Sequence, residues 1–188
     1  MSGKQKLYET FNQLIQTESY DQITIKDFIK IAKVNRNTFY YHFSDMDTFL
    51  KEYLDDKVLF DVEKLILENK LSKAYDNLID YVKDNKKAFI NILSNQKGID
   101  VIDYAFHTSI RMNVQKILYD YEPILKIHLP DEFMIHFAHE IAEEYLKAIK
   151  LQIYNNTNPV MLKKLFVLYS DSISSKLVRV ARAKIFDN

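Results

Sequence analysis

The chain has 188 residues, and 47% of them are hydrophobic and 13% aromatic, which is enough for a substantial apolar core. Only two glycines and three prolines argue against a β-rich fold with many tight turns, and the absence of cysteine excludes disulfides and thiolate metal sites. The 26 basic and 26 acidic residues balance, so net charge does not indicate a nucleic-acid partner. No apolar run reaches the length of about 18 residues that spans a membrane, and we expect a cytoplasmic protein without a membrane partner.

Apolar residues recur at intervals of three and four along the whole chain, which is the period of amphipathic helices. The sustained alternation typical of strands is absent. The sequence therefore predicts an all-α fold of about nine helices, three small ones followed by six larger ones. The expected helices cover, in chain order, about 7–15, 24–32, 36–43, 45–69, 72–84, 86–95, 100–121, 131–154 and 159–185.

Particular residues mark the expected boundaries between these helices. Asp45 or Asp47 is a suitable cap for the long fourth helix. Gly98 predicts a break, Pro123 and Pro130 predict a connector between them, and the polar segment 155–159 predicts a loop.

The most informative segment contains two short helices separated only by Lys33 and Val34. So short a link allows only a sharp corner, and Val34 is placed to fill the angle between the helices. Asn35 is a good amino-terminal cap, because its side chain can accept a hydrogen bond from a free amide near Thr38. This is the helix-turn-helix pattern, in which the second helix enters the major groove of DNA.

A helical wheel at about 100° per residue separates the two faces of that second helix. Phe39 and Phe43 define the buried face, whereas Asn37 and Tyr41 point away from it. Between 23 and 43 four basic residues oppose one acidic residue, a local charge of 4 − 1 = +3. Hydroxyl and imidazole groups suit phosphate oxygens, and longer polar side chains can reach base edges. The alternative is an aromatic mini-core that does not touch DNA. The candidate DNA-binding residues are Thr24, Lys26, Asn35, Arg36, Asn37, Thr38, Tyr40, Tyr41 and His42.

Residues 7–50 resemble the DNA-binding domain of the TetR family of bacterial transcriptional regulators. The shared features are Phe11, the segment 24–32, Val34, the cap at Asn35, Thr38, and the run Phe39-Tyr40-Tyr41-His42-Phe43 before a helix. A weaker likeness covers about 136–168, which is similar to the paired dimerisation helices of many members. The amino-acid sequence of residues 35–43 also resembles that of the subgroup of dihydroxyacetone-kinase regulators.

The resemblance implies a DNA-binding domain over 1–45 and a regulatory and dimerisation domain over 46–188. It implies phosphate contacts from Thr24, Thr38, Tyr40 and His42, and base or groove contacts from Lys26, Arg36, Asn37 and Tyr41. Its partners would be double-stranded operator DNA, a second copy bound through the helices at about 131–154 and 159–185, and a small-molecule effector.

The sequence departs from the family pattern at three positions. Lys33 and Asn37 stand where glycine is frequent, and Met46 replaces a frequent lysine near the start of the fourth helix. If Lys33 is left-handed, a residue other than glycine costs about 1 kcal/mol there. The changes affect the expected operator sequence and affinity more than DNA binding itself.

The last helix carries an apolar stripe that predicts a dimer interface. The stripe is Leu162, Phe166, Tyr169, Ile173, Leu177 and Val180, with a companion face at Ile141, Tyr145, Ala148 and Gln152. Pairing across a two-fold axis would cover both; the alternative is that the stripe packs on the fourth helix of its own chain. A dimer would present two recognition helices to half-sites about 34–36 Å apart, and an effector that alters this separation would weaken binding by linkage.

Histidines raise the questions of metal and ligand binding. His136 and His139 precede Glu140, Glu143 and Glu144, but the Glu-x-x-His pattern of helical di-iron sites is missing, so we expect hydrogen-bonded histidines, no metal and no cofactor. Tyr104, His107 and Arg111 are candidates for a ligand site in the regulatory domain; an ordinary polar edge is the alternative.

These observations predict a sequence-specific DNA-binding regulator of TetR type, a repressor whose operator binding is modulated by a small molecule. Two alternatives stay open: a co-regulator with the same fold that acts through a protein partner with weak or no DNA binding of its own, and a regulator modulated by a protein. An enzyme is not expected, since no catalytic constellation stands out.

Overall fold

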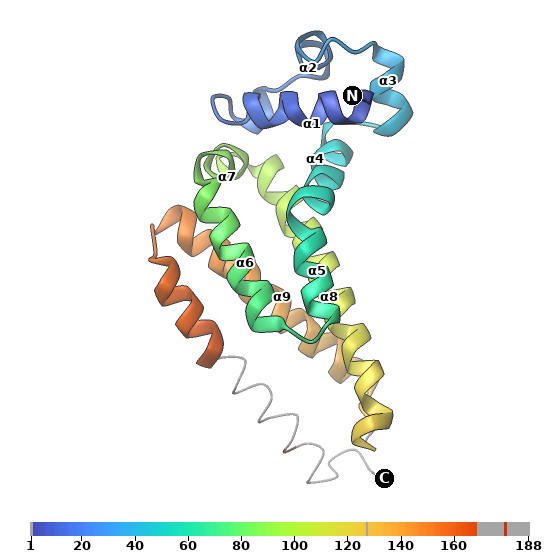
Figure 1. Ribbon diagram of the computed structural model, residues 1–188, viewed down its shortest axis with the longest axis vertical. Helices are drawn as coiled ribbons and strands as arrows, with labels where there is room; N and C mark the ends of the chain where they lie inside the picture. The colour runs from blue at the N-terminus through green and yellow to red at the C-terminus, as the bar shows by residue number, and fades with distance from the viewer. Residues whose placement is uncertain (1, 127, 169–178, 180–188) are drawn as a thin grey trace. The chain divides into compact units, whose positions relative to one another are not determined.

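The computed structural model describes residues 2–126, 128–168 and 179, and within them every regular element is helical (Figure 1). The predicted all-α class is confirmed. The helices with defined bounds are α1 (Gly3–Leu14), η1 (Tyr20–Gln22), α2 (Ile25–Ile31), α3 (Arg36–His42), α4 (Met46–Leu54), η2 (Asp55–Leu59), α5 (Phe60–Leu67), α6 (Leu71–Asp84), α7 (Lys86–Leu93), α8 (Gln96–Leu125) and α9 (Asp131–Tyr154). Residues 159–168 are also helical. No helix of the described chain combines the length and the apolar character needed to cross a membrane.

Side-chain caps determine where the first helices begin. Ser2 and Gln5 form a reciprocal capping box on α1. The predicted caps at Thr24 and Asn35 are confirmed, since their side-chain oxygens accept hydrogen bonds from the amides of Asp27 and Thr38. At α4 the cap is Asp45, which accepts from the Thr48 amide at 2.7 Å.

The predicted long fourth helix is interrupted by the π-helical turn η2. The buried residues across the segment 50–66 are spaced by four, and in an α-helix each such step drifts about 40° around the axis. A π-helical turn holds one more residue than an α-helical turn, which cancels this drift and keeps the residues spaced by four on the buried face. All five positions are consequently buried, namely Leu50, Leu54, Val58, Val62 and Ile66. The segment ends at Asn69, whose backbone is left-handed with φ 57°.

The prediction that Gly98 marks a break between two helices is wrong. It lies in the first turn of α8, where Asn95 accepts a hydrogen bond from its amide at 2.9 Å. A Cβ at this position would come within 1.9 Å of the Ile92 carbonyl oxygen. The glycine therefore permits a tight approach of α7 to α8. Pro123 also lies inside α8, so the connector before Pro130 is shorter than expected.

The described chain divides into two compact units, residues up to 58 with 84–105 and residues 59–83 with those from 106 onward. The first unit has an aromatic core in which Phe11, Phe28, Phe39, Phe43 and Phe49 are at most 1% exposed. The predicted burial of Phe39 and Phe43 is confirmed. The helices α4 and α7 belong to this unit, so the compact unit that contains the helix-turn-helix is larger than the predicted domain 1–45. The boundary between residues 45 and 46 stays a prediction about function.

In the second unit, the described part of the predicted dimer stripe is buried within its own chain, so this part of the prediction is wrong. Phe166 is 2% exposed and stacks on Tyr75 of α6, with ring centroids 3.9 Å apart, and it meets the edge of Tyr145 of α9. Leu162 and the companion residue Gln152 are buried in the same chain. These residues face their own core, because α6 supplies the covering surface that the sequence does not reveal. The remaining stripe residues, Tyr169, Ile173, Leu177 and Val180, lie outside the described residues.

The corner between α2 and α3 gives a stability prediction. Lys33 has φ 52°, a left-handed conformation in which a side chain is unfavourable and glycine is not. Lys33→Gly should therefore raise the free energy of unfolding by about 0.5–1 kcal/mol, measured by urea denaturation with circular dichroism. Lys30→Gly, three residues earlier inside α2, is the matched control and should lower it by a similar amount. A Lys33→Gly variant that is less stable than the parent would contradict this account of the corner.

Candidate nucleic-acid interface

The exposed face of α3 is built from two pairs of residues one helical turn apart. Arg36 lies one turn before Tyr40, and Asn37 lies one turn before Tyr41, so the four side chains form a continuous surface. Tyr41 is 84% exposed and Tyr40 43%. The Arg36 guanidinium lies 5.3 Å from the centre of the Tyr40 ring, a cation–π contact that orders both groups. The face presents a cation, an amide and two phenols to solvent.

Other predicted DNA-binding residues hold the two helices in shape. The Asn35 side-chain oxygen caps α3 and also accepts from the Thr38 hydroxyl at 3.0 Å. Thr24 caps α2 and donates its hydroxyl hydrogen bond to Asp27 at 2.7 Å. His42 is half-buried, with its ring against those of Tyr41 and Phe43. Their first role is therefore local, and phosphate contact from them stays a prediction.

Gly3 connects the amino terminus of α1 to the candidate interface. A Cβ on Gly3 would come 2.5 Å from the Thr38 methyl group, so a larger residue would displace Thr38 or α1. Sequence reasoning missed this contact, because glycine at the start of a helix is an ordinary feature and the partner lies 35 residues away in the sequence.

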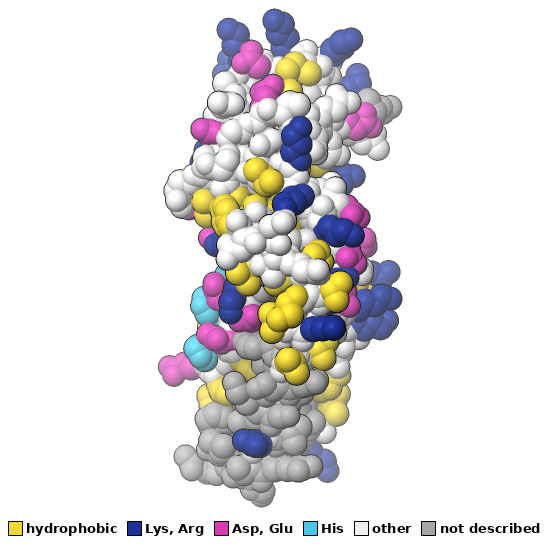
Figure 2. Space-filling view, turned by 90° about the vertical axis from the view of Figure 1, so that its left-hand side faces the viewer, with side chains coloured by type: hydrophobic (Ala, Val, Ile, Leu, Met, Phe, Trp, Pro, Cys, Tyr) yellow, Lys and Arg dark blue, Asp and Glu magenta, His cyan; other side chains and the backbone are white. Residues whose placement is uncertain are grey.

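Positive charge concentrates near the same two helices. Lys26 and Lys30 of α2 are exposed, as are Lys33 in the turn and Arg36 in α3. Lys and Arg side chains project where α2 and α3 form the end of the first unit (Figure 2). Met46, by contrast, is only 5% exposed, so the first turn of α4 contributes packing and no cation.

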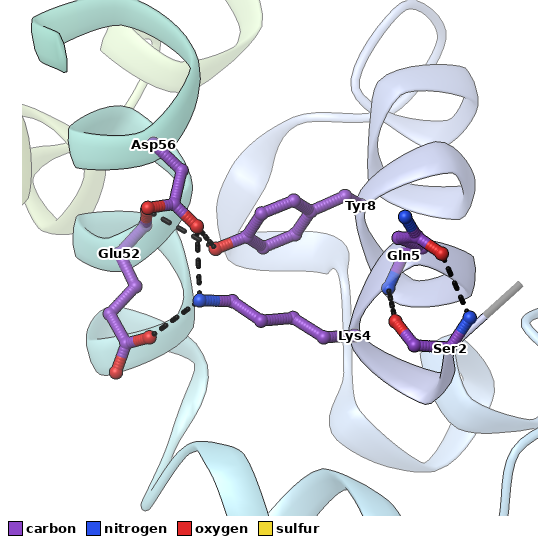
Figure 3. Close-up of polar contacts among 6 residues, drawn as sticks. All are labelled: Ser2, Lys4, Gln5, Tyr8, Glu52 and Asp56. Atoms are coloured by element: carbon purple, nitrogen blue, oxygen red, sulfur yellow. Dashed lines mark hydrogen bonds and ion pairs between the residues drawn. The ribbon is translucent and has the colours of Figure 1, made fainter.

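A polar network fastens α1 to the end of α4 and the turn after it (Figure 3). The Lys4 ammonium lies 3.0 Å from the Asp56 carboxylate and 3.3 Å from that of Glu52. The Tyr8 hydroxyl donates to Asp56 at 2.8 Å. Burial alone would raise the pKa of Asp56, but the hydrogen bonds from Lys4 and Tyr8 outweigh it and lower that pKa. The network therefore stabilises the ionised carboxylate.

A second set of polar contacts joins the end of α1, the η1 segment and the start of α4 to α7 and the start of α8 inside the same unit. The Asn91 amide donates to the Ile15 carbonyl at 2.8 Å, and the hydroxyls of Ser19 and Ser94 are 2.8 Å apart. The buried Tyr20 donates to Asp47 at 2.6 Å, and Lys97 lies 3.1 Å from the same carboxylate. The elements around α2 and α3 are thereby held by α7 and α8, which are distant from them in the sequence.

The predicted ligand residues do not share one environment. Tyr104 is 59% exposed, and the Lys51 ammonium lies 4.7 Å from its ring centre. His107 is half-buried and hydrogen-bonded to His139. Arg111 is half-buried one turn further along α8. A common ligand for the three stays a prediction.

The architecture agrees with that of known regulators. No family model matches the chain. The solved structure named dihydroxyacetone kinase operon activator DhaS superposes with a TM-score of 0.60 at 18% identity, covering 93% of this chain and 95% of that one. A TetR-family regulator from Syntrophomonas wolfei superposes with a TM-score of 0.64 at 14% identity, covering 95% and 94%. A transcriptional regulator from Pseudomonas aeruginosa gives 0.59 at 14% identity, covering 96% and 92%.

The chain has the fold of TetR-family regulators. Among curated proteins, the dhaKLM operon transcriptional activator DhaS of Lactococcus lactis is 24% identical over 127 residues, which span 65% of this chain and 64% of DhaS. The aligned part is thus less than two thirds of that relative. Both comparisons with DhaS agree with the resemblance to dihydroxyacetone-kinase regulators found in the sequence. Within the TetR fold, α2 and α3 form the helix-turn-helix.

The α1 network predicts a pH dependence of stability. The pKa of Asp56 is lower in the folded state, so its contribution is present at neutral pH and is lost as pH falls through that lowered pKa. Asp56→Asn should reduce the free energy of unfolding by about 0.5–1 kcal/mol at pH 7, because the carboxylate is half-exposed. Urea denaturation at several pH values should show the difference between variant and parent shrinking below about pH 4.

Glu9→Gln is the control for this experiment, since Glu9 is an exposed carboxylate on the same helix. It should leave stability and its pH dependence close to those of the parent. A stability difference between Asp56→Asn and the parent that stays constant with pH would remove the carboxylate charge from the account.

Proposed function

We propose that this protein is a sequence-specific DNA-binding transcriptional regulator whose α3 enters the major groove. The observation that carries the proposal is the exposed face of Arg36, Asn37, Tyr40 and Tyr41, presented by a helix whose opposite face is fixed in an aromatic core. The TetR fold supports it, since the neighbours of this chain are named as transcriptional regulators.

The side chains divide by chemistry between bases and phosphates. Arg36 and Asn37 have the donor and acceptor groups that read guanine and adenine edges. The Tyr41 side chain beside them is 84% exposed. Tyr40, with Thr24, Thr38 and His42 beside the caps, offers hydroxyl and imidazole donors for phosphate oxygens, which position the helix without specifying sequence. Lys26 adds a flexible cation at the start of α2.

Removing the phenol of Tyr41, which is 84% exposed, tests the assignment. A binding site is first selected from a pool of random duplexes, and affinity is then measured by fluorescence anisotropy. Tyr41→Ala should weaken binding by about 1–3 kcal/mol per half-site if the phenol contacts a base, with little change in thermal stability. Tyr119→Ala, an exposed tyrosine on α8, is the matched control and should bind normally. Equal affinity of Tyr41→Ala and the parent would exclude Tyr41 from the interface.

The exposed part of the carboxy-terminal helical run supports assembly as a homodimer. Met161, Leu165 and Leu168 are 44–68% exposed and fall on one face, at spacings of four and three residues. Lys163, on another face, pairs with Asp80 of α6 at 2.6 Å and orients the run. We therefore place the dimer contact on the face opposite Phe166, still within the predicted pair of helices 131–154 and 159–185. Two-fold pairing there would supply the symmetry of a palindromic operator.

The corrected face gives a clear test of assembly. Leu165→Asp combined with Leu168→Asp should produce monomers by multi-angle light scattering, because charge would be buried at the contact, and these monomers should bind the selected duplex weakly. Leu67→Asp changes an equally exposed leucine of α5 and should leave the dimer intact. Phe166→Asp is not a suitable variant, since it would disrupt the core of its own chain. A parent protein that is monomeric at micromolar concentration would contradict the proposal.

The direction of control stays a prediction. The sequence predicts repression that a small molecule relieves, whereas both DhaS relatives are named activators. A reporter gene placed behind the selected site reads both signs: repression lowers expression when the protein is present, and activation raises it.

A second candidate is a co-regulator that acts through a protein partner. The buried Met46 and the zero net charge favour it, because both reduce attraction to phosphates. Weak, salt-insensitive binding to every duplex in the selection would support this candidate over the first.

A further inference from the structure

Three metal-binding side chains from two helices converge in the second unit. His107 lies on α8, and His139 and Glu143 lie on α9. One ligand atom from each lies within 4.8 Å of the others. The Nε2 atom of His107 faces the Nδ1 atom of His139 in a hydrogen bond, and it lies 3.8 Å from the Glu143 carboxylate. The cluster joins residues that are 32 and 36 positions apart in the sequence.

Helix geometry explains how the cluster is formed. His139 and Glu143 are four residues apart and project from one face of α9. The neighbouring Ala138 and Ala142 are fully buried, and their small side chains leave α9 firmly seated beside this face. His107 approaches from α8, its ring centre 4.5 Å from that of His139. The three groups are therefore held by two packed helices and not by a loop.

We propose that His107, His139 and Glu143 bind a divalent first-row transition-metal ion such as Zn²⁺. Two imidazole nitrogens and one carboxylate are a ligand set that zinc and its neighbours use in proteins. Zinc bonds to nitrogen of about 2.0–2.1 Å place two histidine nitrogens roughly 3.3 Å apart, so rotation of the rings within the present cluster admits the ion. Water would complete the coordination. The proposal does not depend on DNA binding.

Charge and access favour a cation at this position. The Glu143 side chain is 54% exposed and that of His107 24%, so the ion can enter from solvent. Glu140, next to His139 on α9, is an exposed carboxylate. Glu144 is instead paired with Lys147 at 3.3 Å, and Arg111, one turn from His107 on α8, carries a positive charge. Histidine and acidic side chains lie next to one another on the visible face of the molecule (Figure 2). A hydrogen bond between His107 and His139 does not require a carboxylate nearby, and the Glu143 carboxylate nevertheless lies 3.8 Å from His107. A metal site would use all three groups.

An ion here would join α8 to α9 and stabilise the native second unit, because the three ligands come together only in the folded chain. Tag-free protein is stripped with a chelator and titrated with ZnCl₂ by calorimetry at pH 7.5. We expect one ion per chain and a rise in melting temperature with added zinc. Co²⁺ used in place of zinc should give visible absorption bands of a bound ion.

Four variants separate this cluster from adventitious binding. His107→Ala, His139→Ala and Glu143→Gln remove one ligand each, and each should raise the dissociation constant at least about tenfold, since even residues that only support metal ligands have effects of that size. Glu143→Gln keeps the shape of an exposed side chain and so guards against loss of folding. His136→Ala removes an exposed histidine one turn away on α9 and should bind like the parent. Absence of saturable zinc binding, or equal weakening by His136→Ala, would overturn the proposal.

Discussion

The contact on which the candidate interface depends is the edge-to-face packing of Phe39 on Phe28. Their ring centroids are 6.2 Å apart, and both rings are completely buried. Phe49 of α4 closes the cluster at 4.9 Å from Phe28. A seven-residue helix such as α3 is too short to be stable alone, so its orientation comes from this aromatic core. The residues on the buried side of α3 thus determine which of its side chains face solvent.

The aromatic core supplies most of the apolar contact between these helices, and polar contacts then fix their relative orientation. Lys4 and Tyr8 of α1 contact Asp56 in the π turn, and the Asn91 amide of α7 donates a hydrogen bond to the end of α1. These contacts fix α1, which packs against both α2 and α3, to the rest of the same compact unit. For the function proposed above such attachment matters, because a change elsewhere can reach α3 through elements that are packed against it.

The second unit shows the same division between covered and available surfaces. Phe166 and Tyr145 cover one another together with Tyr75, which removes them from any contact with a second chain. Met161, Leu165 and Leu168 keep their apolar surface exposed. Contiguous apolar surface of this kind on a helical face is typical of protein contacts. Elsewhere in this unit, the cluster of His107, His139 and Glu143 joins α8 to α9 through polar contacts.

The sequence by itself determined the helical class, the caps at Thr24 and Asn35, the sharp corner at Lys33 and the buried pair Phe39 and Phe43. These are local properties, set by spacing and capping within a few residues. It failed at Gly98, whose reason is a close approach to Ile92, and at Phe166, whose partner Tyr75 lies 91 positions earlier. It also gave no sign of the cluster of His107 with His139 and Glu143. Only tertiary packing decides such features, because an apolar or polar side chain carries no local record of which distant helix will cover it.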